Sequence, residues 1–222
     1  MKRSLFRATT SLALGLLLAG VLAGCGGATT PDTGVLPTPS STVSVDRQAA
    51  GLMCDPAGIG DCGIGDIGPG GGIVFYDAGS VQPWGRYLEA APTGWNGGSE
   101  DPKAQWCDNT DSDVDGGYNN EIIGVGKANT VLIKAVCSSG AANLASAYTG
   151  GGKTNWFLPS KDELNELYKQ RETVGGFAVL TYWSSSQSYR GYAWNQYFPM
   201  GPQQNLNHQK HGALSVRPIR AF

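Results

Sequence analysis

The sequence has few charged residues and only two histidines. The first shortage argues against a nucleic-acid partner, and the second leaves few groups for acid–base catalysis. Only 15% of the 222 residues are charged, against about a quarter in an ordinary globular chain. Acidic residues outnumber basic ones by 18 to 16, so we expect no nucleic-acid partner. Glycine is abundant, with 33 residues, but lacks the three-residue period of collagen. A loop-rich fold is therefore expected.

The N-terminus has the plan of an exported chain. Three basic residues among the first seven precede an apolar run at 12–22, which is shorter than the ~20 residues of a membrane-spanning helix. The run ends in Leu-Ala-Gly-Cys, which resembles a bacterial lipobox and implies lipidation of Cys25 after removal of residues 1–24. By resemblance to lipoproteins of bacteria with two membranes, Gly26 favours the outer membrane or the cell surface over the inner membrane.

The processed chain divides into a tether and a domain. Residues 25–52 are rich in Gly, Thr, Pro and Ser, which predicts a lipid anchor followed by a disordered linker. Residues 53–222 form one domain large enough to bury its own core. Thirteen basic minus eighteen acidic residues remain after processing, so the net charge becomes −5.

Four cysteines remain beside the anchor, at positions 54, 62, 107 and 137. In an oxidising compartment they form two disulfides, with three connectivities open. We favour Cys54–Cys62, which closes a short loop, and Cys107–Cys137, which ties a loop to a helix. A zinc site is the alternative, although no two cysteines are separated by two residues as such sites usually require.

Apolar periodicity predicts strands at both ends of the domain and helices in the middle. Strands are expected at 73–76 and 86–91, after a glycine turn at 65–72 that lacks the lysine of a phosphate-binding loop. Helices are expected at 127–137, 141–148 and 161–171. The first has an apolar stripe of Ala128, Val131, Leu132, Ala135 and Val136, and the last begins with a Ser160–Glu163 capping box.

From residue 181 the chain changes to short strands rich in aromatic and amide side chains. Strands are expected at 182–186, 192–198 and 214–222, with Pro218 confining the last one to a sheet edge or leaving an unpaired position in it. We assign Trp183, Trp194 and Phe198 to the core. Arg217 and Arg220 are expected to pair with carboxylates.

Several segments, in order, resemble the Lcl C-terminal domain family, known as domain of unknown function 1566. They are 65–77 (GDIGPGGGIVFYD), 88–92 (LEAAP), 105–107 (QWC), 126–130 (GKANT), 155–164 (NWFLPSKDEL), 182–186 (YWSSS) and 216–222 (VRPIRAF). The resemblance covers about residues 63–222. It implies an α+β, C-type-lectin-like fold with two or three helices, a loop-rich antiparallel sheet in the second half, and paired first and last strands.

The same resemblance implies an exported binding or adhesion protein. Relatives of this type include variable proteins of diversity-generating retroelements, in which template adenines are randomised. Between residues 183 and 216, residue types that can arise when the adenines of an Asn codon are randomised alternate with Trp and Gln, which cannot arise in this way. Met200 fits that scheme poorly. A Tyr, Ser, Gly and Asn mixture is also what any adaptable binding loop uses.

We therefore predict recognition of an extracellular protein or glycan by the loops of residues 187–215. The predicted contact residues are Tyr189, Arg190, Tyr192, Tyr197, Pro199, Leu206, His208 and His211. Arg190, His208, Lys210 and His211 would supply the local positive charge for an acidic glycan. A structural or envelope-assembly lipoprotein without a diversified ligand is the alternative.

One acidic segment has the opening of a calcium loop. Asp111, Asp113 and Asp115 stand at alternate positions before Gly116, as hard oxygen ligands do around Ca²⁺. Glu121 falls one residue before the position of the bidentate ligand, which Ile122 occupies. A Ca²⁺ site and a solvated acidic loop are the two interpretations.

An enzyme is the third functional class, and we predict that the chain is not one. The two histidines have no nucleophilic Cys or Ser motif beside them. The formylglycine-generating enzymes share the implied fold, but their cysteine pair has no counterpart if all four cysteines form disulfides.

Overall fold

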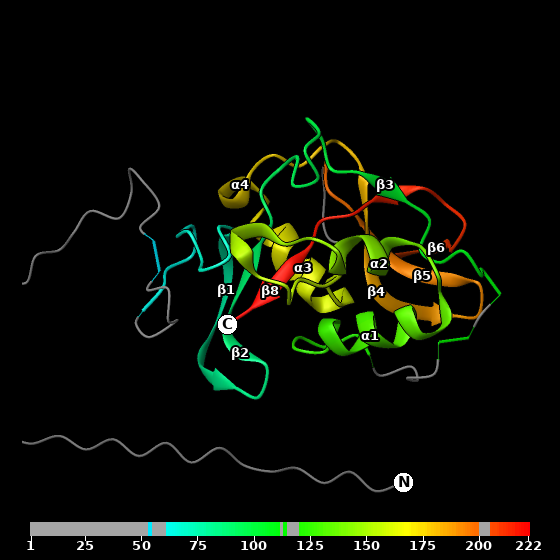
Figure 1. Ribbon diagram of the computed structural model, residues 1–222, viewed down its shortest axis with the longest axis horizontal. Helices are drawn as coiled ribbons and strands as arrows, with labels where there is room; N and C mark the ends of the chain where they lie inside the picture. The colour runs from blue at the N-terminus through cyan, green and yellow to red at the C-terminus, as the bar shows by residue number, and fades with distance from the viewer. Residues whose placement is uncertain (1–52, 55–60, 112, 115–119, 200–204) are drawn as a thin grey trace, which may run out of the picture. The chain divides into compact units, whose positions relative to one another are not determined.

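The computed structural model describes residues 53–54, 61–111, 113–114, 120–199 and 205–222, with the backbone alone at 205–207 (Figure 1). These residues belong to one compact unit of the chain. The signal peptide, the Cys25 anchor and the linker lie outside the described residues and stay predictions. Helices and two separate sheets confirm the α+β class.

The first sheet joins the beginning of the domain to its end. β1 (Ile73–Gln82) and β2 (Gly85–Ala90) form a hairpin, and β2 pairs antiparallel with β8 (Ile219–Ala221). The last strand therefore pairs with the second strand, not directly with the first as expected. The reason is that the hairpin already occupies one edge of β2 and leaves its other edge for β8.

The second sheet has the order β3-β7-β4-β5-β6. Its strands are β3 (Lys103–Ala104), β4 (Thr181–Tyr189), β5 (Tyr192–Tyr197), β6 (Asn205–Gln209) and β7 (Leu214–Ser215). The sheet is mixed, which corrects the expected antiparallel arrangement, because β4 and β7 pair in parallel.

The predicted strand at 214–222 is split into β7 and β8, which belong to different sheets. Pro218 lies in the connection between them, where its missing N–H removes no ladder bond. Of the two expectations for Pro218, the unpaired position is confirmed, since Pro218 lies before the first residue of β8.

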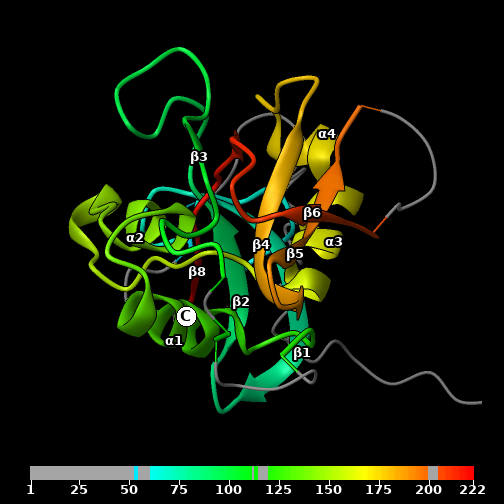
Figure 2. The same cartoon turned by 90° about the vertical axis from the view of Figure 1, so that its right-hand side faces the viewer.

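The helices lie in the middle of the chain as predicted (Figure 2). They are α1 (Gly126–Val136), α2 (Ala141–Ser146), α3 (Lys161–Lys169) and the short α4 (Arg171–Val174), with a 3-10 turn at Gly150–Gly152. The described residues thus contain one helix more than the two or three expected, because the helix predicted at 161–171 ends at Lys169 and a separate helical turn begins at Arg171. The capping box of α3 is present: Ser160 Oγ accepts from the Glu163 N–H, and Glu163 accepts from the Ser160 N–H.

The orientation of α1 contradicts the apolar-stripe prediction. Its buried residues are Gly126, Asn129, Thr130 and Ile133, while Val131, Leu132 and Val136 are exposed. Polar contacts explain this orientation. Asn129 Nδ2 donates to the Asn120 carbonyl at 2.7 Å, and the Leu158 N–H donates to Thr130 Oγ1 at 3.0 Å. Buried hydroxyl and amide groups that find partners hold this face inward.

Two apolar clusters form the main core. Trp106, Ile133, Trp183 and Val216 pack between α1, α2 and the five-stranded sheet. A second cluster joins α3 to both sheets through Phe75, Leu88, Leu164, Leu167, Tyr182, Phe198 and Ile219. The core assignments of Trp183 and Phe198 are confirmed. Trp194 is only partly buried, and the Lys161 ammonium lies 4.0 Å from its ring centroid.

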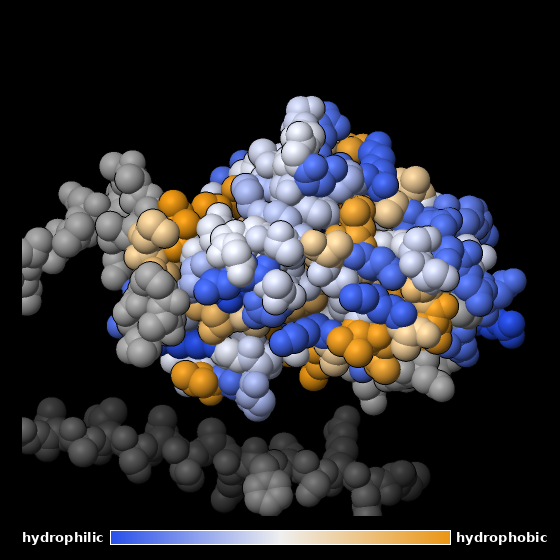
Figure 3. Space-filling view, viewed as in Figure 1, coloured by the Kyte–Doolittle hydropathy of each residue, from blue (hydrophilic) through white to orange (hydrophobic). Residues whose placement is uncertain are grey.

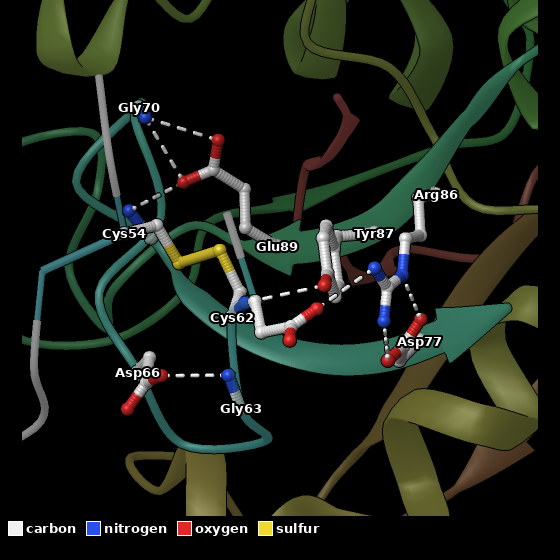
Figure 4. Close-up of a disulfide and its surroundings, with 11 residues drawn as sticks. Cys54, Cys62, Gly63, Asp66, Gly70, Asp77, Arg86, Tyr87 and Glu89 are labelled. Atoms are coloured by element: carbon white, nitrogen blue, oxygen red, sulfur yellow. Dashed lines mark hydrogen bonds and ion pairs between the residues drawn. A yellow bond between two sulfur atoms is a disulfide. The ribbon is translucent and has the colours of Figure 1, made fainter. Parts of the chain in front are cut away.

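Buried ion pairs hold both C-terminal arginines, as the sequence predicts. Arg217 pairs with Asp101 at 2.6 Å, and its guanidinium also donates to the carbonyls of Ala91 and Gly176. Arg220 pairs with Glu89 at 2.7 Å. The Glu89 carboxylate also accepts the N–H groups of the 65–72 turn at positions 70 and 72 (Figure 4). A Cβ at either glycine would collide with atoms of residues 89 or 90.

Both predicted disulfides are present, Cys54–Cys62 and Cys107–Cys137. The first lies beside the three-stranded sheet, where the Cys62 N–H donates to the Tyr87 hydroxyl (Figure 4). The second joins the loop after β3 to the end of α1. Two disulfides indicate folding in an oxidising, extracytoplasmic compartment. Among the described residues, no helix has the length and apolarity needed to cross a bilayer.

The Glu163 carboxyl predicts a pH dependence of stability. It is fully buried and accepts backbone N–H groups at Gly124 and Ser160, and burial raises its pKa to about 7. Because the folded pKa lies above the unfolded one, its contribution is complete below pH ~4.5 and disappears as pH rises to about 7, by roughly 3 kcal/mol. Urea unfolding at several pH values measures it.

The Glu163→Gln variant is the control for this pH dependence. It is expected to be less stable than the wild type over this whole pH range, because an amide nitrogen replaces one of the two carboxylate oxygens that accept backbone N–H groups. Its stability should fall less steeply between pH 4.5 and 7, because an amide does not titrate. An equal slope in both proteins would assign the titration to other groups.

Candidate functional site

The turn between β4 and β5 carries three of the predicted contact residues together. Tyr189 and Tyr192 are directly opposite each other in the ladder, and their rings stack with centroids 4.3 Å apart. Arg190 and Gly191 form the turn, and Gly191 has a φ of 80°, which a side chain would strain. Tyr189 and Arg190 are exposed and Tyr192 is partly so. Two stacked rings beside a guanidinium thus face solvent on a tight turn.

The loop of residues 107–114 supports this turn from the side. Arg190 Nε donates to the Asp111 carbonyl at 3.1 Å. Gln187 in β4 donates to the Asp113 carboxylate at 2.5 Å and accepts from the Val114 N–H at 3.1 Å. The Cys107–Cys137 disulfide fixes the start of the same loop. The site is therefore built from two segments distant in sequence.

Lys210 also supports the turn, because it is buried and donates to Gln187. Its burial corrects the prediction that Lys210 supplies positive charge at the surface. It is fully buried, its ammonium donates to Gln187 Oε1 at 2.6 Å, and it lies 4.5 Å from the Trp106 ring centroid. Burial lowers the pKa of Lys210 to about 8, partly offset by the carboxylates of Asp113 and Asp111. It therefore cannot contribute to the surface charge that would attract an acidic glycan.

The other predicted contact residues are not gathered around the turn. Tyr197 is exposed but pairs with Thr181 at the opposite end of β5, roughly 16 Å along the strand from Tyr192, and Pro199 follows it. Pro199 lines a cavity of about 240 Å³ with residues 175–179 and Phe198. Tyr197 and Pro199 belong to a different part of the surface.

The two histidines lie beyond β5. His208 is opposite Ala193 in the ladder, and its ring meets Trp183 edge-on at 5.8 Å. Because Gln209 is opposite Tyr192 and donates to its hydroxyl at 3.0 Å, His208 points to the other face of the sheet. His211 is exposed in the turn after β6. The side chain of Leu206 lies outside the described residues.

The predicted calcium loop is described only in part. Asp111 and Asp113 are exposed, and Asp113 accepts the Gln187 hydrogen bond; Asp115 lies outside the described residues. Within the described part, one group of three potential metal ligands comes together, Cys107, Asp108 and Cys137. The sulfur atoms of both cysteines are bonded to each other in the disulfide, so this group does not form a metal site.

Sequence reasoning missed the two residues that build the support, Gln187 and Lys210. The sequence places Gln187 at the start of the predicted binding loops without a role of its own, and it predicts Lys210 as surface charge. No local pattern indicates that the acidic loop contacts Gln187, because Asp113 and Gln187 are 74 residues apart in the sequence.

Comparison of the chain with protein-family models and with curated protein sequences finds no match.

Proposed function

We propose that the chain is an envelope-displayed, adhesin-like lipoprotein that binds an extracellular protein or glycan through the β4–β5 turn. In this proposal the domain has a C-type-lectin-like fold of the Lcl C-terminal type, carried on a lipid-anchored linker. The mixed α+β architecture, with strands from both ends in one sheet, is compatible with that fold. The disulfides agree with an envelope location.

The stacked, exposed Tyr189–Tyr192 pair carries the proposal. Tyrosine provides a large amphipathic contact area and has little rotamer freedom to lose on binding. The pair is supported by the Gln209 bond and by the loop contacts of Gln187 and Arg190. A ligand would therefore meet a surface ordered before binding, which lowers the entropic cost.

Retroelement diversification of this region is part of the proposal, and the geometry limits where variation fits. Tyr189 and Arg190 are exposed, so many side chains are tolerated there. Gly191 has a positive φ, which a side chain would strain, so it is better explained as a constant position than as a randomised one. A reverse-transcriptase gene and a near-copy of the codons for residues 183–222 in neighbouring DNA would test the idea, and their absence would end it.

An envelope-assembly role without a diversified ligand stays the alternative, and an enzyme of the formylglycine-generating type comes third. The pairing of all four domain cysteines is the observation that disfavours the latter, because no thiol pair remains for catalysis.

The test is a combined Tyr189→Ala, Arg190→Ala, Tyr192→Ala variant of the full chain. Binding of the wild-type chain is first measured on glycan and extracellular-protein arrays. The variant is expected to bind any positive partner at least thirtyfold more weakly, since aromatic and arginine anchors each contribute about 2 kcal/mol or more. The thermal midpoint should change by only a few degrees, because Tyr189 and Arg190 are exposed, Tyr192 is partly exposed, and none of the three belongs to the apolar core.

Tyr197→Ala is the matched control. Tyr197 and Tyr189 are equally exposed at 43%, but Tyr197 lies at the far end of β5. It should leave binding unchanged. Unchanged binding of the combined variant would refute the site, and the lack of any array partner would favour the envelope-assembly alternative.

A further inference from the structure

The helix α1 presents an apolar surface to solvent. Val131 is 64% exposed, Leu132 37% and Val136 42%, and the neighbouring Ala128 and Ala135 are exposed as well. Figure 3 shows hydrophobic atoms gathered on the part of the surface where α1 lies in Figure 1. A contiguous exposed apolar patch of this kind marks an interaction site rather than ordinary surface.

The turn of the β1–β2 hairpin extends the same surface. A cavity of about 410 Å³ between the two elements is lined by Pro83 and Trp84 of the turn and by Ala128 and Val131 of α1. Figures 1 and 2 both place the hairpin turn and α1 at the same end of the domain. We use the name α1–hairpin surface for Pro83, Trp84, Val131, Leu132 and Val136.

Positive charge lies on this surface. Lys127 and Lys134 are exposed and stand seven residues apart, so they flank Val131 on one side of the helix, about 10 Å apart along its axis. Three carboxylates lie near this surface: Glu121 pairs with Lys161, Glu163 is buried but lines the cavity, and Asp108 accepts the Ser138 N–H just beyond the end of α1. The surface is apolar and cationic, although the whole chain carries a formal charge of −2.

This chemistry favours a lipid bilayer over a second copy of the chain. A two-fold pairing of antiparallel α1 helices would bring Lys127 of one copy close to Lys134 of the other, and like charges repel. An anionic bilayer instead takes valine and leucine into the headgroup boundary, places tryptophan at headgroup level and pairs lysine with phosphates. A fluid bilayer also fills the uneven cavity beside Trp84.

We propose that the α1–hairpin surface docks the domain on a bilayer that carries anionic phosphate headgroups. The proposal rests on the lipid anchor of the proposed function but not on its ligand. A short surface of this size binds weakly by itself. A tether that ends in the same bilayer raises the effective concentration of the surface there, so weak docking is sufficient.

Trp84 gives a local measurement of docking. It is the first tryptophan in the sequence, so the N-terminal segment contributes no tryptophan signal. The full chain is reconstituted in vesicles of brominated phosphatidylcholine, with or without phosphatidylglycerol. The Trp84 signal is the difference between wild type and Trp84→Phe. We expect it to be quenched in vesicles containing phosphatidylglycerol and much less in phosphatidylcholine alone.

The lysines and the valines provide two sets of variants that should each weaken docking. The Lys127→Gln, Lys134→Gln pair should lower the ratio of docked to undocked domain about 25-fold, fivefold for each lysine. Val131→Ser with Val136→Ser should also reduce quenching. Val179→Ser is the matched control, since Val179 is 74% exposed outside this surface, and it should leave quenching unchanged.

Three results would overturn the proposal: an unquenched Trp84 in both vesicles, quenching that ignores the lysine variants, or self-association that Val131→Ser abolishes while Trp84 stays unquenched. The last result would assign the surface to a second copy. None of them affects the array measurements on the Tyr189 variant, so the two proposals fail separately. Circular dichroism of each variant verifies folding.

Discussion

Replacing Arg217 by alanine is expected to lower the free energy of unfolding by about 3–5 kcal/mol, the largest effect of any single change considered for this chain. The guanidinium is 1% exposed and the Asp101 side chain is fully buried. Truncation leaves that carboxylate without its counter-charge and removes the donors to the Ala91 and Gly176 carbonyls. Urea unfolding followed by tryptophan fluorescence measures the loss.

Two further variants separate the charge effect from the loss of an arginine. Arg86 pairs with Asp77 at 2.9 Å, but both side chains are about 30% exposed, so Arg86→Ala should cost at most about 1 kcal/mol. Removing both buried charges, with Arg217→Met and Asp101→Leu, should recover much of the loss, because no unpaired charge is then buried. Equal costs for the two arginine variants would contradict the argument.

Removal of the Cys107–Cys137 disulfide by paired alanine substitutions is expected to cost about 3.7 kcal/mol. The chain-entropy relation gives this value for the loop that the bond closes, which has a sequence separation of 30. Cys54–Cys62, with a separation of 8, gives about 2.6 kcal/mol and provides the matched comparison. Denaturant unfolding of the two double variants measures both.

The two disulfides should also differ in their effect on binding. Residues 107–114 hold Gln187 and Arg190, so loss of the 107–137 bond should weaken ligand binding even where the domain stays folded. Loss of the 54–62 bond should not. An equal effect of both variants would mean that the loop does not support the turn.

Local sequence patterns predicted most helices and strands. The pairing of the strands depends on long-range contacts and could not be predicted from those patterns. The capping box located α3 because its two hydrogen bonds involve residues three apart. The oxidising compartment predicted two disulfides, and the favoured one of three open connectivities is confirmed by the structure. The prediction of one continuous strand at 214–222 is wrong, because β7 pairs with β3 and β8 pairs with β2, and both partners lie more than a hundred residues away in the sequence.

The helix α1 shows where periodicity fails. Its apolar stripe is present as the sequence predicts, but the stripe faces solvent, whereas the apolar face of an amphipathic helix usually faces the core. Asn129 and Thr130 are buried because Asn120 and Leu158 supply partners for them, and no pattern within the helix reveals those partners. The same limit applies to the candidate site, where residue types suggested Tyr189, Arg190 and Tyr192, but only the fold separates them from Tyr197.

The late position of β8 has a consequence for biosynthesis. The last seven residues supply the partners of Asp101, Glu89 and Phe157, through Arg217, Arg220 and Ile219. A nascent chain that still lacks them leaves two carboxylates without counter-charges and the first sheet without its third strand. Closure of the first sheet therefore depends on contact between residues 88–101 and residues 216–222, and any step that keeps these two segments apart keeps the domain open.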